Sequence, residues 1–387
     1  MRLSDVCEFI IDCPHTTAKD EGKGYPLIRT PNVGKGRLLL DDVHRVSERV
    51  YQERNFLGTP EDGDLIFARE APAGNVALVT KGEKVCMGQR TVLIRPNTQY
   101  VVPEFLTYYL LAPEQQYKLL GTANGATVAH VNLPVIRKMP ILLPEMSVQM
   151  KLAGILSAYD NLIENNQKQI KLLEEAAQRL YREWFVDLRF PGYEETEIVD
   201  GVPAGWSNQC LSDFADVVMG QSPKSEFYNQ VNEGLPFHQG VGSYGTRFVI
   251  DDTYSTSFTR IAEANSILFS VRAPVGRLNI TKNKIVIGRG LSAMKHKKNL
   301  QSYLFYMLKE RFFKDDIVGN GSIFSSITKN ELLGQKFLIP SNSLDEKYDL
   351  IVSKIDEKIA VCDGEILRLT QARDRLLPKL MNGEIEV

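Results

Sequence analysis

The sequence has few residues of the kinds that build disulfide frameworks, zinc sites or hydrolytic centres. Its five cysteines are scattered and form no C-x-x-C pair, which argues against a disulfide scaffold and a zinc finger. Its five histidines are equally dispersed, and no H-E-x-x-H segment occurs. We therefore expect no metal site and no catalytic residue in this chain.

Net charge and long apolar runs are also lacking. The 46 basic and 48 acidic residues leave a net charge of −2, which excludes a histone-like polycation but permits a local basic face. No apolar run approaches the roughly 20 residues of a membrane span, and the first residues do not resemble a secretory signal. With 387 residues, 43% of them hydrophobic, the chain is predicted to form two or three globular domains in the cytoplasm.

Nucleotide and cofactor motifs are absent or incomplete. No phosphate-binding G-x-x-x-x-G-K-[ST] loop occurs. A lone G-x-G-x-x-G at Gly240, Gly242 and Gly245 precedes residues that favour a strand, whereas a dinucleotide site needs a helix there. The pattern of an amino-methyltransferase is missing, because the nearest segment, 132–135, lacks the aromatic residue. These absences favour a binding or scaffolding role, although an enzyme with an unrecognised site stays open.

The chain contains an internal repeat of about half its length. Six segments recur in the same order: 3–5 as 211–213, 65–67 as 267–269, 71–74 as 273–276, 105–108 as 303–306, 124–125 as 320–321 and 142–144 as 338–340. Pro144 and Pro340 are 196 residues apart, whereas Leu3 and Leu211 are 208 apart, so the copies differ by insertions in their front parts.

Each copy has a front part rich in glycine, proline and β-branched residues, followed by a long helix. Short strands are predicted at 76–79 and 91–94, and a helix at 104–120. The first long helix should run from a Ser147 N-cap to about Phe185. The second should start with a capping box at 343–346 and end or kink at Pro378.

Both long helices carry apolar residues at heptad spacing, which favours a supercoiled pair. The alternative is that each helix lies on its own domain. Roughly 35 residues at 1.5 Å each give about 50 Å, longer than the face of a small domain, so we expect the helices to pair. The predicted interface consists of Leu156, Ile163, Ile170, Leu173, Leu180, Trp184, Val352, Ile355, Ile359, Ile366, Leu369 and Leu376. An antiparallel pair would hold two heads at opposite ends of a pseudo-twofold rod.

The front parts carry polar and basic residues in loops that contain glycine and proline. Arginine and lysine suit guanine edges and phosphates, and glutamine and asparagine suit adenine edges. The predicted DNA-binding residues of the first copy are His15, Thr16, Thr17, Arg29, Asn32, Lys35, Arg37, Arg69, Gln89 and Arg90. Those of the second copy are Gln221, Ser222, Lys224, Ser225, His238, Gln239, Arg247, Arg272, Arg277, Arg289, Lys295 and Lys297.

Four passages together resemble the specificity subunits of Type I restriction–modification enzymes. They are Leu142-Leu143-Pro144-Glu145 with Gln149 and 153–158, then 180–187 with 190–192, then Val202-Pro203-Ala204-Gly205-Trp206, and finally 375–380 with 383–385. One departure is that 145–149 lacks the Glu-Gln pair of the family's helix start.

The resemblance implies an α+β fold with two mixed α/β target recognition domains joined by two long antiparallel coiled-coil helices. The expected segments are target recognition domain 1 at 1–144, a central conserved helix at 145–190, target recognition domain 2 at 191–340 and a C-terminal conserved helix at 341–387. Each recognition domain would read half of a split site on double-stranded DNA. Two modification subunits carrying S-adenosylmethionine, and restriction subunits using ATP and Mg²⁺, would associate with a chain that is itself non-catalytic.

The paired helices would set the unread spacer between the half-sites. Heads about one DNA turn apart would meet half-sites roughly 34–36 Å apart. Within the first helix, Asn166 could be a buried residue that fixes register or an exposed one. A different class of function is also open: a structural adaptor with two peptide-recognition heads. DNA binding should weaken steeply with salt, whereas binding in apolar grooves should not.

Overall fold

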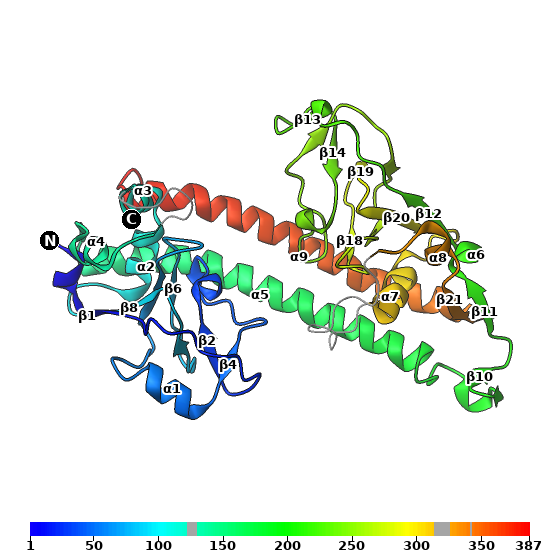
Figure 1. Ribbon diagram of the computed structural model, residues 1–387, viewed down its shortest axis with the longest axis horizontal. Helices are drawn as coiled ribbons and strands as arrows, with labels where there is room; N and C mark the ends of the chain where they lie inside the picture. Colours follow the sequence, from blue (N-terminus) through cyan, green and yellow to red (C-terminus); the bar gives the residue numbers. More distant parts are fainter. Residues whose placement is uncertain (122–129, 313–325, 341–342) are drawn as a thin grey trace. The chain divides into compact units, whose positions relative to one another are not determined.

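The computed structural model describes residues 1–121, 130–312, 326–340 and 343–387. These form two compact units: Met1–Asn165 with Ile366–Val387 in unit 1, and Asn166–Glu365 in unit 2. Each unit contains a segment of both long helices, α5 (Met146–Phe185) and α9 (Leu344–Met381) (Figure 1). We call the remaining parts of units 1 and 2 head 1 and head 2.

Head 1 is built on a main sheet with the strand order β1-β8-β5-β6-β3 and a smaller sheet with the order β4-β2-β7. The strands are β1 (Cys7–Asp12), β2 (Tyr25–Ile28), β3 (Gly36–Arg37), β4 (Arg45–Val46), β5 (Leu65–Ala68), β6 (Val76–Leu78), β7 (Cys86–Met87) and β8 (Thr91–Pro96). The helices are α1 (Glu48–Arg54), α2 (Pro103–Leu111), α3 (Pro113–Leu120) and α4 (Leu133–Lys138). The strands predicted at 76–79 and 91–94 are confirmed.

Head 2 repeats the main sheet as β12-β20-β17-β18 and has a second sheet in the order β13-β15-β14-β19-β16. Further pairs are β9–β10 and β11–β21. The strands are β9 (Ile198–Val199), β10 (Val202–Pro203), β11 (Ser207–Cys210), β12 (Ala215–Met219), β13 (Tyr228–Asn229), β14 (Leu235–His238), β15 (Tyr254–Ser255), β16 (Ile261–Ala262), β17 (Ile267–Ser270), β18 (Leu278–Ile280), β19 (Ile285–Ile287), β20 (Leu291–His296) and β21 (Lys336–Ile339). The helices are α6 (Leu211–Phe214), α7 (Gln301–Phe312) and α8 (Lys329–Leu333).

Strand β5 is apolar throughout and its counterpart β17 is apolar except for Ser270, because both faces of each main sheet are covered. In β5, Leu65 and Phe67 pack in a core with α2 and the long helices, while Ile66 packs in a second core on the opposite face. In β17, Ile267 and Leu268 divide in the same way. The long helices and α2 or α7 therefore cover one face of each main sheet, and loops and the second sheet cover the other.

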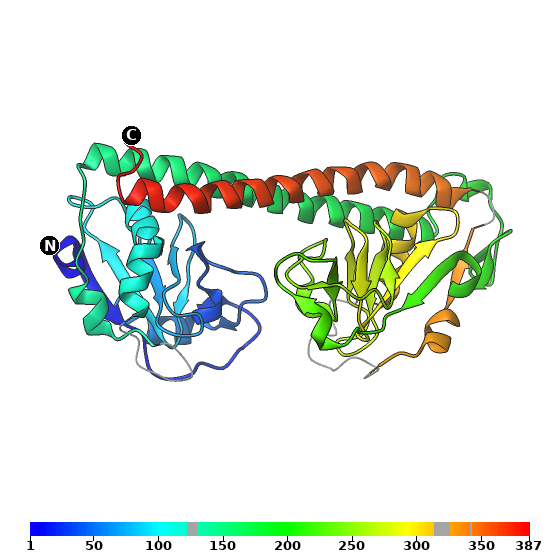
Figure 2. The ribbon, with the colours of Figure 1, turned by 90° about the horizontal axis from the view of Figure 1, so that it is seen from above.

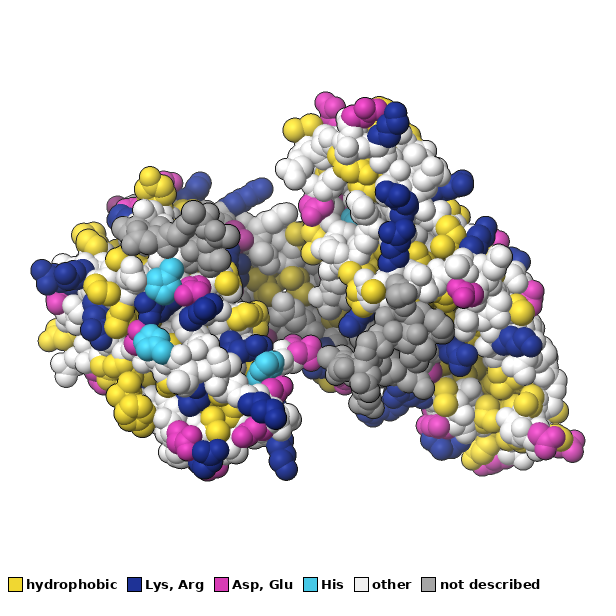
Figure 3. Space-filling view, viewed as in Figure 1, with side chains coloured by type: hydrophobic (Ala, Val, Ile, Leu, Met, Phe, Trp, Pro, Cys, Tyr) yellow, Lys and Arg dark blue, Asp and Glu magenta, His cyan; other side chains and the backbone are white. Residues whose placement is uncertain are grey.

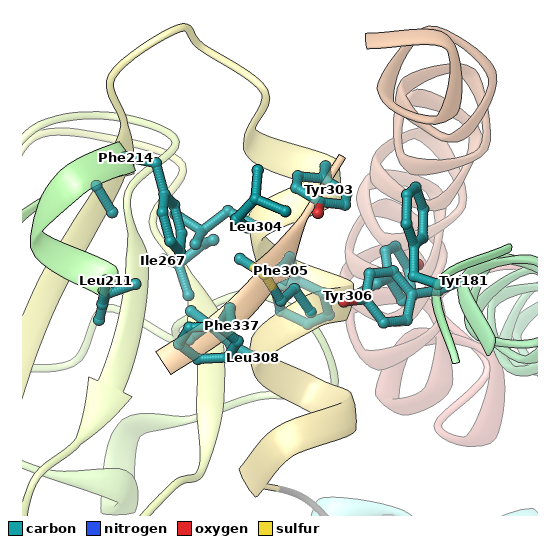
Figure 4. Close-up of a cluster of buried hydrophobic side chains, with 14 of the residues drawn as sticks. Tyr181, Leu211, Phe214, Ile267, Tyr303, Leu304, Phe305, Tyr306, Leu308 and Phe337 are labelled. Carbon is teal, nitrogen blue, oxygen red and sulfur yellow. The ribbon is translucent and has the colours of Figure 1, made fainter. Parts of the chain in front are cut away.

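Helix α7 links the main sheet of head 2 to the long helices. Figure 4 shows Tyr303 and Tyr306 turned toward Tyr181 on α5, whereas Leu308 turns toward Phe337 of β21. The ring centroids of Tyr181 and Tyr303 are 6.0 Å apart. One short helix thus serves two packing surfaces and fixes the head against α5 and α9.

Within each unit the segments of α5 and α9 pack in antiparallel directions along one side of the head (Figure 2). In unit 2, Tyr348 near the start of α9 packs edge-on against Tyr181 near the end of α5 and donates a hydrogen bond of 2.9 Å to the carbonyl of Ala177. In unit 1, Leu380 near the end of α9 shares a core with Leu156 near the start of α5.

Helix boundaries differ from the predictions in four places. The helix predicted at 104–120 is broken at Ala112, whose backbone is extended because Pro113 follows it. Helix α5 already begins at Met146, so Ser147 is not its N-cap. Ser343 has a φ of 52°, and the backbone N–H of Glu346 donates to Asp345 instead, so the predicted capping box is absent. Pro378 lies inside α9, where it costs only one hydrogen bond near the helix end.

The observed architecture confirms the predicted α+β class with two mixed α/β heads and two long helices. The compact units include segments of both helices, whereas the predicted domains at 1–144, 145–190, 191–340 and 341–387 separate heads from helices. Those four boundaries stay a prediction.

Candidate nucleic-acid interface

Three loops converge in head 2 and expose polar side chains. They follow β12, β14 and β19, and we call residues 220–225, 239–240 and 288–290 loop cluster 2. The backbone N–H of Gln221 donates to the carbonyl of Ile287 at 2.9 Å, that of Arg289 to the Ser222 hydroxyl at 3.2 Å, and that of Gly290 to the carbonyl of Gln239 at 3.1 Å. Two backbone–backbone hydrogen bonds and one to the Ser222 hydroxyl thereby join these loops.

The close approach of these loops requires glycine. A Cβ atom at Gly220 would lie 2.1 Å from the carbonyl oxygen of Gly288, and one at Gly288 would lie 2.8 Å from the Cα of Gln239. Neither clash can be relieved by turning a side chain, because both partners are backbone atoms. Glycine at these positions therefore lets three chain segments meet.

Most polar side chains of loop cluster 2 are accessible. Gln221, Lys224, Ser225, Gln239 and Arg289 are exposed, and Ser222 is half-buried. Two cations, two amides and two hydroxyls on one set of loops supply both donors and acceptors for base edges and phosphates.

Head 1 has the equivalent arrangement, which we call loop cluster 1: residues 13–17, 28–30 and 88–90. The Gln89 side chain donates to the carbonyl of His15 at 2.7 Å and accepts from the Thr17 hydroxyl at 3.0 Å. Gly88 donates to the carbonyl of Ile28 at 2.9 Å. The side chain of His15 is 75% exposed, and the exposed Arg90 follows Gln89 directly.

A buried arginine that the sequence did not single out supports loop cluster 1. The Arg54 guanidinium donates to the carbonyl of Met87 at 2.7 Å and to that of Thr16 at 2.9 Å. Arg54 is at the end of α1, and no motif in the sequence distinguishes it from the exposed arginines nearby. Its donors hold two of the three loops together.

Next to loop cluster 1 lies an ion network that the sequence also did not reveal. Arg69 is paired with Asp12 at 2.7 Å and contacts the His130 ring at 2.9 Å. Glu70 in turn contacts His130 at 2.7 Å and Arg90 at 2.9 Å. In Figure 3 the visible face of unit 1 shows histidine, basic and acidic side chains side by side. The predicted residues Arg69 and Arg90 thus have acidic neighbours distant in sequence.

The remaining predicted DNA-binding residues are not gathered into the loop clusters. Asn32 and His238 are buried, and the His238 ring contacts Asp251 and Ser243. Arg37 pairs with Glu164 on α5. Arg247 is 2% exposed and pairs with Glu174 on α5 and Asp356 on α9. The others lie elsewhere on the heads: Lys35, Arg272, Arg277 and Lys297 are exposed, and Lys295 is half-buried.

The residues of the predicted helix interface are all buried or half-buried. In unit 1, Leu156 and Ile163 are buried, and Ile366, Leu369 and Leu376 are half-buried. In unit 2, the buried ones are Ile170, Trp184, Val352 and Ile359, and the half-buried ones are Leu173, Leu180 and Ile355. Asn166 is buried and not exposed, and its role in fixing the helix register stays a prediction.

Among the described residues, no group of three or more histidine, cysteine or acidic side chains could hold a metal ion. In the same part of the chain, no helix is long and apolar enough to cross a membrane.

Comparisons with known proteins agree with this architecture. The family model of the Type I restriction modification DNA specificity domain matches residues 1–175 and again 203–371. The putative type I restriction enzyme MjaX specificity subunit of Methanocaldococcus jannaschii is 29% identical over 100% of this chain and 93% of its own length. The type I restriction enzyme HindI specificity subunit of Haemophilus influenzae is 22% identical over 93% of this chain and 95% of its own.

A solved structure supports the fold. The S subunit of a Type I restriction-modification system from M. genitalium aligns with a TM-score of 0.58 at 16% identity, covering 98% of this chain and 95% of that one. Because the family model covers both copies of the repeat, the chain belongs to the Type I restriction modification DNA specificity family.

Proposed function

We propose that this protein is the DNA sequence-specificity subunit of a Type I restriction–modification complex, and that each head reads one half of a bipartite target. The observation that carries the proposal is the pair of loop clusters. In each head, three separate segments converge at equivalent positions and present exposed donors and acceptors.

Differences between the clusters support two different half-sites. Loop cluster 1 has the exposed Arg90 beside the half-buried Gln89, whereas loop cluster 2 has the exposed Arg289 and Gln239. Arginine pairs with the O6 and N7 of guanine and glutamine with the N6 and N7 of adenine, so a changed residue at the same place changes the preferred base. Arg37 and Arg247 are left out of the proposed DNA-binding set because their guanidinium groups are paired with the long helices.

The partners in this proposal are two modification subunits, which would dock on the long helices, and restriction subunits. Exposed apolar side chains along α5 and α9 support docking: Leu162, Leu172, Leu350, Val361 and Leu367. S-adenosylmethionine, ATP and Mg²⁺ would belong to the partner subunits, and this chain would catalyse nothing itself.

The direct test is genome-wide methylation mapping with and without this chain. We expect a bipartite motif that disappears when the chain is removed and that changes in one half only when residues of one loop cluster are replaced. Incubating the purified chain alone with DNA and labelled S-adenosylmethionine should give no methyl transfer. Turnover by the chain alone would instead support an enzyme with an unrecognised site.

Salt dependence separates DNA binding from a peptide-binding adaptor. The slope of log K against log salt is negative for DNA binding, and each phosphate contact removed should reduce its magnitude by about 1. We expect this for Lys224→Gln and for Arg289→Gln if its contact is to a phosphate. As a control, Lys358→Gln changes an exposed lysine on α9, outside both heads, and should leave the slope unchanged. A weak slope that none of these variants changes would favour the adaptor.

A further inference from the structure

In each unit an aspartate on a long helix contacts the head, at equivalent positions of the repeat; Asp160 is buried and Asp356 is half-buried. Asp160 on α5 and Asp356 on α9 are 196 residues apart, the same separation as Pro144 and Pro340. Asp160 is 5% exposed and accepts a hydrogen bond of 2.7 Å from the Tyr108 hydroxyl. Asp356 accepts one of 3.2 Å from the hydroxyl of Tyr306, the counterpart of Tyr108.

Each aspartate also has an arginine partner, but the two arginines come from different parts of the chain. In unit 1, Arg373 of α9 lies 2.6 Å from Asp160. In unit 2, Arg247 from a loop of head 2 lies 2.6 Å from Asp356. The side chain of Asp160 is 6% exposed and that of Asp356 is 20% exposed. The buried Asp160 carboxylate in particular requires such a partner, because an unpaired buried charge is strongly destabilising.

Neither arginine has a charged counterpart at the equivalent position of the other unit. Gly34 donates to the carbonyl of Arg37 as Gly245 donates to that of Phe248, so the position equivalent to Arg247 in unit 1 is Gly36. Gly36 has a φ of +93°, and a Cβ there would lie 3.3 Å from the Asp160 carboxylate. Conversely, the position equivalent to Arg373 in unit 2 is Ala177, which is fully buried. Gly36 therefore occupies the position of Arg247 in unit 1, and Ala177 occupies the position of Arg373 in unit 2. Neither residue can supply a charge.

The two aspartates bind the helices of the heads that also pack on the main sheets. Tyr108 belongs to α2, and Tyr306 belongs to α7. In unit 2 the guanidinium of Arg247 also lies 3.5 Å from the centroid of the Phe305 ring on α7. Apolar packing tolerates small rotations, whereas charge-assisted hydrogen bonds depend on direction and therefore restrict the angle of a head on its helices.

We propose that Asp160–Tyr108–Arg373 and Asp356–Tyr306–Arg247 are positioning clusters that set the orientation of loop clusters 1 and 2, respectively, for half-site recognition. This inference rests on the proposed function. Under this inference, base discrimination by head 1 depends on Arg373 of the C-terminal helix. Base discrimination by head 2 depends on Arg247, which belongs to head 2 itself.

The experiment uses the complete complex with its modification subunits. Methylation rates are measured on the cognate site and on sites with single-base changes in either half, and Arg90→Ala and Arg289→Ala assign each half to a head. We expect Arg373→Gln to lower discrimination about tenfold in the half read by head 1 and to leave the other half within about twofold, since one good base contact is worth roughly 5- to 150-fold. Arg247→Gln should have the reverse effect.

Two further variants guard against loss of folding. Tyr108→Phe and Tyr306→Phe remove one hydroxyl each with little change in volume and should shift the same halves more weakly. Arg373→Lys should restore part of the discrimination that Arg373→Gln loses. Arg375→Gln, an exposed arginine on the same helix, is the control and should change neither half.

A merely structural role would reduce the amount of complex and lower methylation of all sites equally. Equal loss in both halves, or no change in either half, would overturn the inference. If the wild-type complex shows no bipartite motif at all, the proposed function fails instead.

Discussion

Arg247 and Arg289 are both arginines in loops of head 2, and nothing in their local sequence separates their roles. Arg289 is exposed in loop cluster 2, whereas Arg247 lies over the Phe305 ring and pairs with two acidic residues of the long helices. Only the folded chain brings Glu174 and Asp356 to Arg247. At the residue scale, a predicted DNA contact therefore needs the tertiary partners of the side chain before it can be assigned.

Tyr108 illustrates how burial fixes the role of a single group. Burial, followed by the charge of Asp160, raises the pKa of its hydroxyl. The hydroxyl therefore stays protonated and acts as the donor in its hydrogen bond to Asp160.

We predict that His296 makes the stability of unit 2 depend on pH. Burial lowers the pKa of His296 from 6.5 to about 4, so the folded state keeps it neutral. Between these values the unfolded state binds a proton that the folded state does not, so stability falls as the pH drops from about 6.5 to about 4. The loss is at most about 3 kcal/mol.

Urea unfolding followed by tryptophan fluorescence tests this, because both tryptophans, Trp184 and Trp206, lie in unit 2. His296→Asn keeps an acceptor for the backbone N–H groups of Lys298 and Leu300 but cannot titrate. Its free energy of unfolding should change less between pH 7.5 and pH 4.5 than that of the wild type. An equal change in both proteins would contradict the assignment to His296.

At the element scale, the pattern of apolar residues was the most reliable guide. Heptad spacing located buried faces of α5 and α9, and the apolar runs at 65–67 and 267–269 are central strands. Helix ends were less predictable, because a cap depends on backbone angles that the sequence does not determine. Ser343 is an example, because its φ of 52° prevents the capping box that the sequence pattern at 343–346 predicts.

We predict that two isoleucines of α9 differ sharply in their contribution to stability. Ile359 is fully buried and Ile351 is 46% exposed. Ile359→Ala should lower the free energy of unfolding of unit 2 by about 2–5 kcal/mol, because it removes buried methyl groups and leaves a cavity. Ile351→Ala, the matched control, should cost less than about 1 kcal/mol. Urea titrations followed by tryptophan fluorescence measure both, and similar losses would refute the predicted buried face.

At the scale of the whole molecule, one fold is used twice with different loops. The long helices and main sheets recur at nearly constant separation, while the front parts differ in length and in polar residues. The ion network of head 1 is an example of this divergence, because Val271 occupies the position of Arg69 in head 2. A duplicated scaffold with divergent loops suits two half-sites of different sequence.

We predict that a heptad added to or removed from the first long helix between Asn166 and Leu173 changes the spacer of the target and leaves both half-site sequences intact. Seven residues make about two helical turns, or roughly 10 Å, so the apolar face is preserved while the helix length changes. Methylation sequencing reads the motif directly. An active complex with an unchanged spacer would show that α5 does not set the distance.

The amino-acid sequence by itself determined the repeat, the two mixed heads, the long helices and their apolar faces. These follow from local periodicity and from similarity between segments, which need no knowledge of distant contacts. The tertiary structure alone decided which polar residues meet, because loop clusters 1 and 2, the ion network at His130 and the buried partners of Asp160 and Asp356 join segments from tens to more than two hundred residues apart. The spacing of residues along the sequence does not predict such contacts. They are determined by which side chains the fold buries together and by the geometry of their hydrogen bonds.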